Sequence, residues 1–278
     1  MDIRIIDSLV PESEVGTAIQ ALVRTQLANE QSLDATLRQI GFYGGKTLLI
    51  GGFVDGRLAT MNAFMPQTFV KGGDSVVGYQ SGFSATGGEH RGKGYWPKLM
   101  AAGLDLIRAE GGAFVFGFPN PVSHPLFEKK LDFTTASMWR VVGPAMGTHV
   151  IRLESRRAER FYRPDLRQLA TSKRESDPGL VQVEANGGFA FGKVRTSKGL
   201  RVADVGGLEC AGGDLSSIVR ALCKAARAPF FRLEASDSSE FETGLRPKRA
   251  SRPVILKSLG APLAITDISF VGGLADSY

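Results

Sequence analysis

The sequence predicts a mixed α/β fold, with mixed sheets and two related lobes. Two observations lead to this prediction. Strands and helices alternate through the first half, where a glycine-rich, basic loop separates a strand from an amphipathic helix. In addition, residues 127–142 and 241–256 are similar at a constant shift of 114 residues, which indicates an internal repeat.

The elements of the first half follow from hydrophobic periodicity and turn chemistry. Asp55-Gly56 is a strong hairpin sequence between two apolar segments. Ser32 is a suitable N-cap, and Gly41 a suitable end, for a short helix. The expected elements are a strand at 2–8, helices at 14–27 and 32–40, strands at 46–54, 57–66 and 76–85, a helix at 94–110, a strand at 113–118, a short helix, and a last strand at 135–143.

The second half starts with a segment of different composition. Residues 144–180 are basic, polar and poor in strand signals, so we expect them to connect the lobes. Further on, Asp214 is expected to cap a helix that ends at Ala226. The other expected elements are strands at 188–196, 200–209, 229–235 and 252–259. The predicted domains are residues 1–145, a basic connecting segment at 146–180, and a second lobe at 181–278.

The repeat is carried by few identities, but the order of the elements agrees with it. The shift that aligns 127–142 with 241–256 also places the AFVFGF strand roughly over APFFRL. Two related halves would bury a shared interface. The identical pairs are Phe127/Phe241, Glu128/Glu242, Leu131/Leu245, Ala136/Ala250 and Ser137/Ser251.

Composition limits the classes of function. The chain has 278 residues and a net charge of +6, and its basic excess is local: residues 150–175 hold eight Lys/Arg against four acids. This favours an anionic partner such as a phosphate-bearing cofactor or nucleic acid, although a solvated basic face would look the same. No apolar run is long enough to span a membrane. The N-terminal sequence lacks a secretory pattern, and the cysteines are only Cys210 and Cys223, so a reduced, cytoplasmic protein is expected.

The loop within SATGGEHRGKGYWPKL has the chemistry of a phosphate site. It leaves a strand and opens a helix, so backbone N–H groups and the helix dipole point outward together. Gly92 and Gly94 permit positive φ, while Arg91 and Lys93 add charge. The chain lacks a Gly-Lys-Ser/Thr sequence here and a Gly-x-Gly-x-x-Gly after the first strand. From these residues alone, a phosphate cradle and a simple basic turn are both possible.

The surrounding pattern resembles the GNAT acyltransferase superfamily. Its pyrophosphate loop reads Arg/Gln-x-x-Gly-x-Gly/Ala, and this chain has RGKGYW at 91–96. An Asn after the next strand and an aromatic–x–Lys–x–Leu–x–aromatic helix end also match, as Asn120 and FEKKLDF. The resemblance covers residues 2–143 by element order and is specific over about 84–133.

The resemblance implies acyl transfer from acyl-CoA, usually acetyl-CoA, to an amine without an enzyme nucleophile. In that family the loop amides hold the pyrophosphate, and the preceding strand pairs with the pantetheine and polarises the thioester. The implied donor-binding residues are Phe83, Ser84, Ala85, Thr86, Arg91, Gly92, Lys93, Gly94, Tyr95, Trp96 and Asn120. The second half has ECAGGDL where a basic loop should lie, so the resemblance implies one acyl-CoA site, in the first lobe.

Two residues depart from the family pattern. Trp96 replaces a Gly or Ala, and Phe127 stands where many members carry a Tyr that protonates the leaving thiolate. The candidate catalytic groups are therefore His124, since histidine is the most common general acid or base, and Tyr79. The alternatives are a histidine that bonds locally at a helix start and a tyrosine of the core. The spacing of histidines and cysteines predicts no metal site.

The resemblance also implies which partners the chain binds. We expect a small amine acceptor, such as an amino sugar or an amino-acid-like metabolite, bound in a site that the second lobe walls. No membrane or nucleic-acid partner is expected, and the chain should be a monomer or homodimer. Two other functions stay open: a non-catalytic acyl-CoA-binding protein, motivated by Phe127, and an aminoacyl-tRNA-dependent transferase that uses the basic residues of 150–175.

Overall fold

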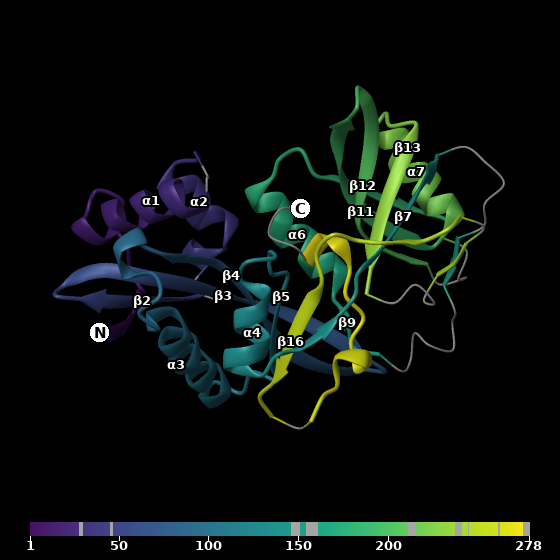
Figure 1. Cartoon of the computed structure of the whole chain (residues 1–278). Coiled ribbons are helices and arrows are strands. Elements are labelled where there is room, and N and C mark those ends of the chain that lie inside the picture. Colours follow the sequence, from purple (N-terminus) through teal and green to yellow (C-terminus); the bar gives the residue numbers. More distant parts are fainter. Residues whose placement is uncertain are drawn as a thin grey trace.

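The computed structural model of the chain has two mixed β-sheets with helices packed against them (Figure 1). The residues that the structure describes are 1–27, 30–44, 47–145, 151–153, 161–210, 215–236, 241–243, 245–260 and 262–274. Among these residues, no helix is long and apolar enough to cross a membrane.

The first sheet has the strand order β1-β2-β3-β4-β5-β16-β6, and β9 pairs with the far end of β3. All its pairings are antiparallel except that of β4 with β5. The strands are β1 Asp2–Ile5, β2 Leu48–Val54, β3 Arg57–Lys71, β4 Asp74–Thr86, β5 Phe114–Gly117, β16 Val254–Ser258, β6 Thr134–Ala136 and β9 Arg163–Pro164.

Helices cover both faces of this sheet (Figure 1). α1 (Glu14–Leu27) and α2 (Leu33–Gln39) pack on one face, and α3 (Tyr95–Ala109) and α4 (His124–Leu131) on the other. A Cβ on Gly103 would lie 2.4 Å from the Phe64 ring, so glycine lets α3 approach the sheet closely. The predicted N-cap Ser32 is confirmed, because its side chain accepts from the amide of Ala35.

The second sheet repeats this plan with the strand order β10-β11-β12-β13-β7-β15. Helix α7 (Ser216–Ala225) covers one face of it, with buried contacts to β11, β12 and β13. The strands are β10 Val181–Ala185, β11 Gly188–Ser197, β12 Leu200–Cys210, β13 Phe230–Ala235, β7 Trp139–Pro144 and β15 Lys248–Arg249, while β8 Ile151–Leu153 pairs separately with β14 Phe241–Thr243.

The two sheets exchange strands. β16, from the end of the chain, pairs with β5 and β6 in the first sheet, whereas β7, from the first half, pairs with β13 and β15 in the second. The orders β4-β5-β16-β6 and β12-β13-β7-β15 are therefore equivalent. The repeat predicted from the sequence is confirmed, since β6 corresponds to β15 and β7 to β16 at the predicted shift.

Other predictions need correction. The expected strand at 135–143 is two strands in different sheets, because the chain turns at Ser137 and Met138, where Met138 is buried between the lobes. The strands expected at 57–66 and 76–85 run further than predicted, as β3 and β4, and Gly72-Gly73 joins them in a second hairpin. The predicted cap Asp214 lies outside the described residues, and α7 starts at Ser216.

The segment at 144–180 is not only a connection. It contains α6 (Leu166–Ser176), capped by Asp165, whose side chain accepts from the amides of Arg167 and Gln168. The helix was missed because its buried face consists of Leu166, Leu169 and Ala170 only, among charged residues.

A phenylalanine-rich core joins the lobes. Phe69, Phe114 and Phe116 of the first sheet pack in one buried cluster with Phe191 and Phe270 from the second half of the chain. Phe69 lies edge-to-face on Phe114 with a centroid separation of 5.0 Å. The lobes therefore share buried apolar surface as well as exchanged strands.

The exchange predicts that residues 1–145 alone do not fold stably. This fragment lacks β16, whose Val254, Ile255 and Leu256 are at most 2% exposed between β5 and β6. Urea unfolding followed by circular dichroism should show no cooperative transition for the fragment. Co-expression with residues 146–278 should restore one. A fragment that unfolds cooperatively near the midpoint of the full chain would contradict the expectation.

Candidate functional site

The candidate site lies where β4 and β5 separate. The two strands pair in parallel only over Gly78–Gln80 and Phe114–Phe116. β4 then continues for six residues to Thr86 with no ladder pair to β5 in the described structure. The backbone of this stretch therefore presents an open strand edge, to which an extended ligand can pair.

A β-bulge distorts β4 along this open edge. Ala63 pairs with Gly82 and Met61 with Ala85, so Phe83 and Ser84 together lie opposite the single residue Asn62. Phe83 has a φ of 49°, in the left-handed region that non-glycine residues rarely adopt. The bulge changes the direction of the backbone groups in the part of β4 expected to meet the thioester.

A buried polar cluster holds the two sides of the bulge. The side-chain carbonyl of Asn62 accepts from the hydroxyl of Ser81 at 3.2 Å and from that of Ser84. Its amide group donates to the carbonyl of Ala63 at 3.0 Å, and the residue is 0% exposed. Sequence reasoning missed Asn62. Its signal was a lone amide in the apolar strand LATMNAFM, since a buried polar group requires partners.

The glycine loop follows the end of β4. A short 3₁₀ turn, η2 (Gly88–His90), leads to Gly92 and Gly94, which have φ values of 75° and 74°. A Cβ at either position would meet nothing within 4 Å, so conformation and not space requires glycine there.

The loop presents unpaired donors. In the described chain, no backbone acceptor is paired with the amides of Gly92, Lys93 or Gly94. Gly94 is also the N-cap of the 15-residue helix α3, which adds the positive end of its dipole. Free amides at a helix N-terminus form an anion-binding arrangement.

The charged residues of the loop lie at its rim. The guanidinium of Arg91 donates to the side-chain oxygen of Gln26 on α1, and Lys93 is exposed. His90 is largely buried, with its ring 5.9 Å from that of Tyr95, and its Nε2 lies 3.4 Å from the carboxylate of Glu89. Arg91 and Lys93 thus place positive charge beside the free amides.

The two departures from the family pattern contact each other. The rings of Trp96 and Phe127 pack edge-to-face with centroids 4.9 Å apart, and Phe127 packs in the same way on Phe133. Phe127 is 5% exposed. The indole N–H of Trp96 is buried without an acceptor among the described residues. The large side chain at position 96 is therefore part of the core between α3 and α4.

The side chain of Asn120 closes the turn that precedes α4, whose N-cap is Ser123. The side-chain oxygen of Asn120 accepts from the amides of Val122 and Ser123 at 3.0 and 2.9 Å, and its backbone carbonyl accepts from the amide of His124. These bonds fix the turn between β5 and α4, and they leave the side-chain NH₂ with no hydrogen-bond acceptor among the described residues.

His124 points toward the far edge of the first sheet. Its Nε2 lies 3.0 Å from the hydroxyl of Thr135 on β6 and 3.4 Å from the carboxylate of Glu128. Since Thr135 donates to Glu128, the Nε2 of His124 donates to Thr135. β6 is three strand positions from β4, or about 14 Å at the usual strand spacing. The structure does not bring His124 to the bulge.

Tyr79 is also remote from the loop. Its hydroxyl donates to the carboxylate of Glu110, at the C-terminal end of α3, at 3.4 Å. Burial raises the pKa of Tyr79, and the charge of Glu110 raises it further. Glu110 lies sixteen positions after Gly94, at the other end of α3, a length of roughly 24 Å. Residues 83–86 and 91–96 follow one another along the chain at the open end of β4, and Asn120 follows β5, whereas Tyr79 bonds near the C-terminal end of α3 and His124 bonds at β6.

The equivalent opening in the second lobe is filled by the chain itself. β12 and β13 pair in parallel only as far as Val205 and Leu233, and then separate. Val271 bridges to Ala235, and the amide of Ser236 donates to the carbonyl of Phe270. The following turn, η5 (Gly272–Leu274), lies against β12, and Leu274 is 0% exposed. The predicted counterpart of the loop, ECAGGDL, lies mostly outside the described residues.

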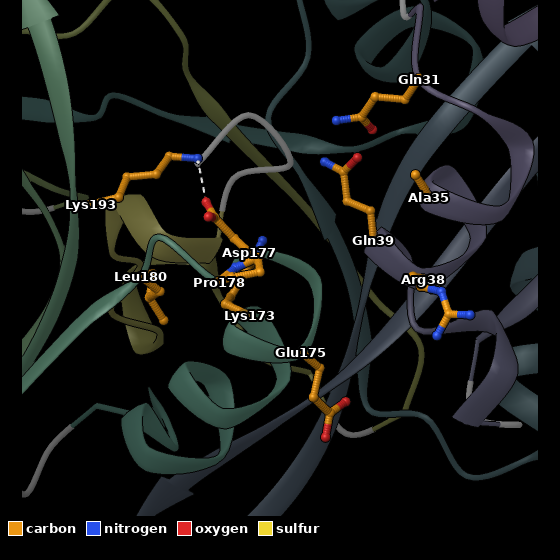
Figure 2. A pocket seen from close by; sticks show the side chains of 10 residues that line it. All are labelled: Gln31, Ala35, Arg38, Gln39, Lys173, Glu175, Asp177, Pro178, Leu180 and Lys193. Carbon is orange, nitrogen blue, oxygen red and sulfur yellow. Dashed lines mark hydrogen bonds and ion pairs between the residues drawn. The ribbon is translucent and has the colours of Figure 1, made fainter.

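A polar pocket of about 450 Å³ lies between the lobes (Figure 2). Lys193 of β11 reaches Asp177 at 3.4 Å across it, and Gln31 and Gln39 extend toward it from the first lobe. Leu33 and Leu37 of α2 pack toward the sheet, whereas Ala35, Arg38 and Gln39 line the pocket. Helix α2 thus stands between this pocket and the β4 bulge. The remaining lining residues are Lys173, Glu175, Pro178 and Leu180.

No group of three or more potential metal-binding side chains occurs in the described part of the chain. The polar groups gathered at the opening are backbone amides, hydroxyls, carboxamides and loop cations. This set is suited to hold an anionic, extended ligand.

Comparison with known proteins agrees with this geometry. A family model described as acetyltransferase (GNAT) domain matches residues 21–136. A GCN5-related N-acetyltransferase from Kribbella flavida shares the fold at a TM-score of 0.62 and 15% identity, over 96% of this chain and 74% of that one. A GCN5-related N-acetyltransferase from Anabaena variabilis shares the fold at a TM-score of 0.61 and 11% identity, over 93% of this chain and 73% of that one. A probable N-acyltransferase from Enterococcus faecalis shares the fold at a TM-score of 0.62 and 10% identity, over 93% of this chain and 72% of that one. No curated protein matches the chain.

Because the turn η5 fills the opening of the second lobe, we expect alanine substitutions at its two neighbouring glycines to differ in their effect on the free energy of unfolding. A Cβ at Gly273 would lie 2.6 Å from the carbonyl oxygen of Gly206, whereas at Gly272 the nearest atom would be 3.4 Å away. Gly273→Ala should lower the free energy of unfolding by about 1–3 kcal/mol, as overpacking does. Gly272→Ala should change it by less than about 0.5 kcal/mol. Urea unfolding measures both, and equal effects would show that the turn does not fill the opening.

Proposed function

We propose that this chain, whose residues 21–136 match the acetyltransferase (GNAT) domain and whose fold is shared by GCN5-related N-acetyltransferases, transfers an acyl group, most simply acetyl, from acyl-CoA to the amine of a small acceptor. One observation carries the proposal: a strand with an open edge runs into a loop of free amides at a helix N-terminus. CoA has the matching shape, with an extended pantetheine followed by a pyrophosphate.

In the proposed complex the amides of Gly92–Gly94 and the side chain of Arg91 hold the pyrophosphate. The open edge of β4 pairs with the pantetheine, and the NH₂ of Asn120 is available to one of its carbonyls. The bulge at Phe83 directs a backbone N–H to the thioester oxygen. Each of these groups is present with the required chemistry, and none of them needs a metal ion.

The transfer is direct. The lone pair of the acceptor amine attacks the thioester carbon, the new C–N bond forms, and the C–S bond breaks to release CoA thiolate. The proton lost by the amine passes to solvent or to the acceptor's own basic groups. The protein supplies proximity and stabilisation of the oxyanion.

The acceptor is proposed to be an amino sugar or an amino-acid-like amine. The pocket between the lobes carries charged groups of both signs, which supports a polar ligand on that side of α2. The place of the second lobe in acceptor binding stays a prediction, since α2 separates this pocket from the bulge.

A second candidate function is acyl-CoA binding without turnover. It is favoured by the positions of the two predicted catalytic groups, since His124 bonds at β6 and Tyr79 at the far end of α3. Phe127 cannot donate a proton in their place. No observation favours the aminoacyl-tRNA alternative, whose basic segment is partly the packed helix α6.

Donor binding should be visible as stabilisation. Saturating acetyl-CoA at about 100 times its Kd adds roughly 2.7 kcal/mol to the stability, which raises Tm by several degrees. Arg91→Ala combined with Gly94→Asp should abolish this shift, because the charge and the anion-binding turn are both lost. Differential scanning fluorimetry gives the shift, and calorimetry should give one donor per chain.

The matched control is Lys224→Ala, which removes an exposed positive charge from α7 in the second lobe. It should leave the shift unchanged. A wild-type Tm that does not respond to acetyl-CoA would reject the proposed donor.

Turnover distinguishes the two candidate functions. Release of free thiol from acetyl-, propionyl- and longer acyl-CoAs, measured with DTNB against panels of amino sugars, amino acids and polyamines, should rise above hydrolysis for at least one pair. Mass spectrometry should show the acceptor heavier by the acyl group. Donor binding without thiol release across the panel would favour the non-catalytic function.

A further inference from the structure

Asn62 lies at the one place where the backbone of β4 is distorted. It is opposite both bulge residues, Phe83 and Ser84, and the ladder between β3 and β4 resumes in a shifted register beyond it. Its neighbours on the strand, Met61 and Ala63, are apolar and buried. A carboxamide with no exposed surface at this position would be costly unless its hydrogen bonds are made.

The partners of Asn62 come from both sides of the bulge. The hydroxyl of Ser81 precedes the bulge and that of Ser84 is part of it, and both donate to the same side-chain oxygen. The side-chain NH₂ donates to the carbonyl of Ala63, which fixes which end of the carboxamide faces the serines. Asn62 therefore links the regular and the distorted parts of β4.

A second contact ends the distorted stretch. The hydroxyl of Thr60 donates to the carbonyl of Ala85 at 3.0 Å and lies 2.8 Å from the hydroxyl of Thr86. Asn62 and Thr60 thus hold β4 from the same neighbouring strand on the two sides of Phe83, whose φ of 49° would otherwise relax toward the β region.

We propose that Asn62 is a positioning residue for acyl transfer, which acts through Ser81 and Ser84 to hold the β4 bulge in the conformation that directs its backbone N–H at the thioester. This inference rests on the proposed function. Asn62 itself is buried and touches no substrate. Its contribution is the orientation of groups that do, so it should affect kcat more than donor binding, which depends mainly on the glycine loop.

The test compares two substitutions of similar size. Asn62→Leu fills the space but offers no acceptor, so the two hydroxyls lose their common partner. Asn62→Asp keeps an oxygen that both hydroxyls can reach. We expect Asn62→Leu to lower kcat on the order of 10- to 100-fold, as a small misplacement of reacting groups does, with the Kd of acetyl-CoA changed by less than about threefold. Asn62→Asp should recover part of kcat.

A double variant tests whether Asn62 affects kcat through Ser84. Ser84→Ala should also lower kcat, and the double variant with Asn62→Leu should be no worse than Asn62→Leu alone, because both remove the same contact. Leu104→Ala serves as the stability control, since it opens a cavity in the buried cluster of α3, to which Asn62 does not belong. It should lower Tm without a comparable loss of kcat.

The results either support or overturn the positioning role of Asn62. An Asn62→Leu protein with wild-type kcat, or one whose kcat falls only in proportion to Tm as in Leu104→Ala, overturns the positioning role and leaves the proposed function intact. A wild-type protein that neither binds nor turns over acetyl-CoA overturns both. A loss of kcat at constant Kd, with partial rescue by Asn62→Asp, supports the inference.

Discussion

The early end of the parallel pairing between β4 and β5 is the constraint on which the rest of the site depends. A parallel sheet normally continues its ladder, and here only Gly78–Gln80 and Phe114–Phe116 take part. Beyond them β4 must satisfy its backbone in another way or leave it for a ligand. The bulge, the glycine loop and the N-terminus of α3 all follow this point along the chain, so they form one continuous stretch beyond the end of the ladder.

The second lobe shows the same constraint with a different solution. β12 and β13 also separate after a short parallel ladder, but residues 270–274 lie in the opening and take up backbone groups there. Those residues follow β16, the strand that completes the first sheet. One stretch of chain thus supplies a strand to the first lobe and closes the opening of the second, which ties the integrity of both to the C-terminal part of the protein.

The sequence predicted those features that depend on local chemistry. The hairpin at Asp55-Gly56, the cap at Ser32 and the left-handed glycines 92 and 94 each follow from one or two residues and their neighbours. The repeat was also readable, because similar elements recur in the same order.

Features that depend on contacts between residues far apart in the sequence could not be predicted from it. The exchange of β7 and β16 keeps the same strand pattern whichever sheet each one joins, so periodicity cannot reveal it. The positions of His124 and Tyr79 depend on Thr135 and Glu110, which the fold brings beside them. Asn62 could be flagged as a polar residue in an apolar strand, but only the register of β3 against β4 shows what it holds.

Trp96 and Phe127 should be considered as one change to the family pattern, because their rings are in contact. The indole occupies space that a Gly or Ala at position 96 would leave open, and it packs against the residue that would otherwise be a Tyr. In the proposed transfer, the cost of losing the tyrosine hydroxyl is moderate, since a thiol has a pKa of about 8.5 and its thiolate can leave near neutral pH without a full proton transfer. The requirement that then remains is orientation, which we propose that groups on β4 supply.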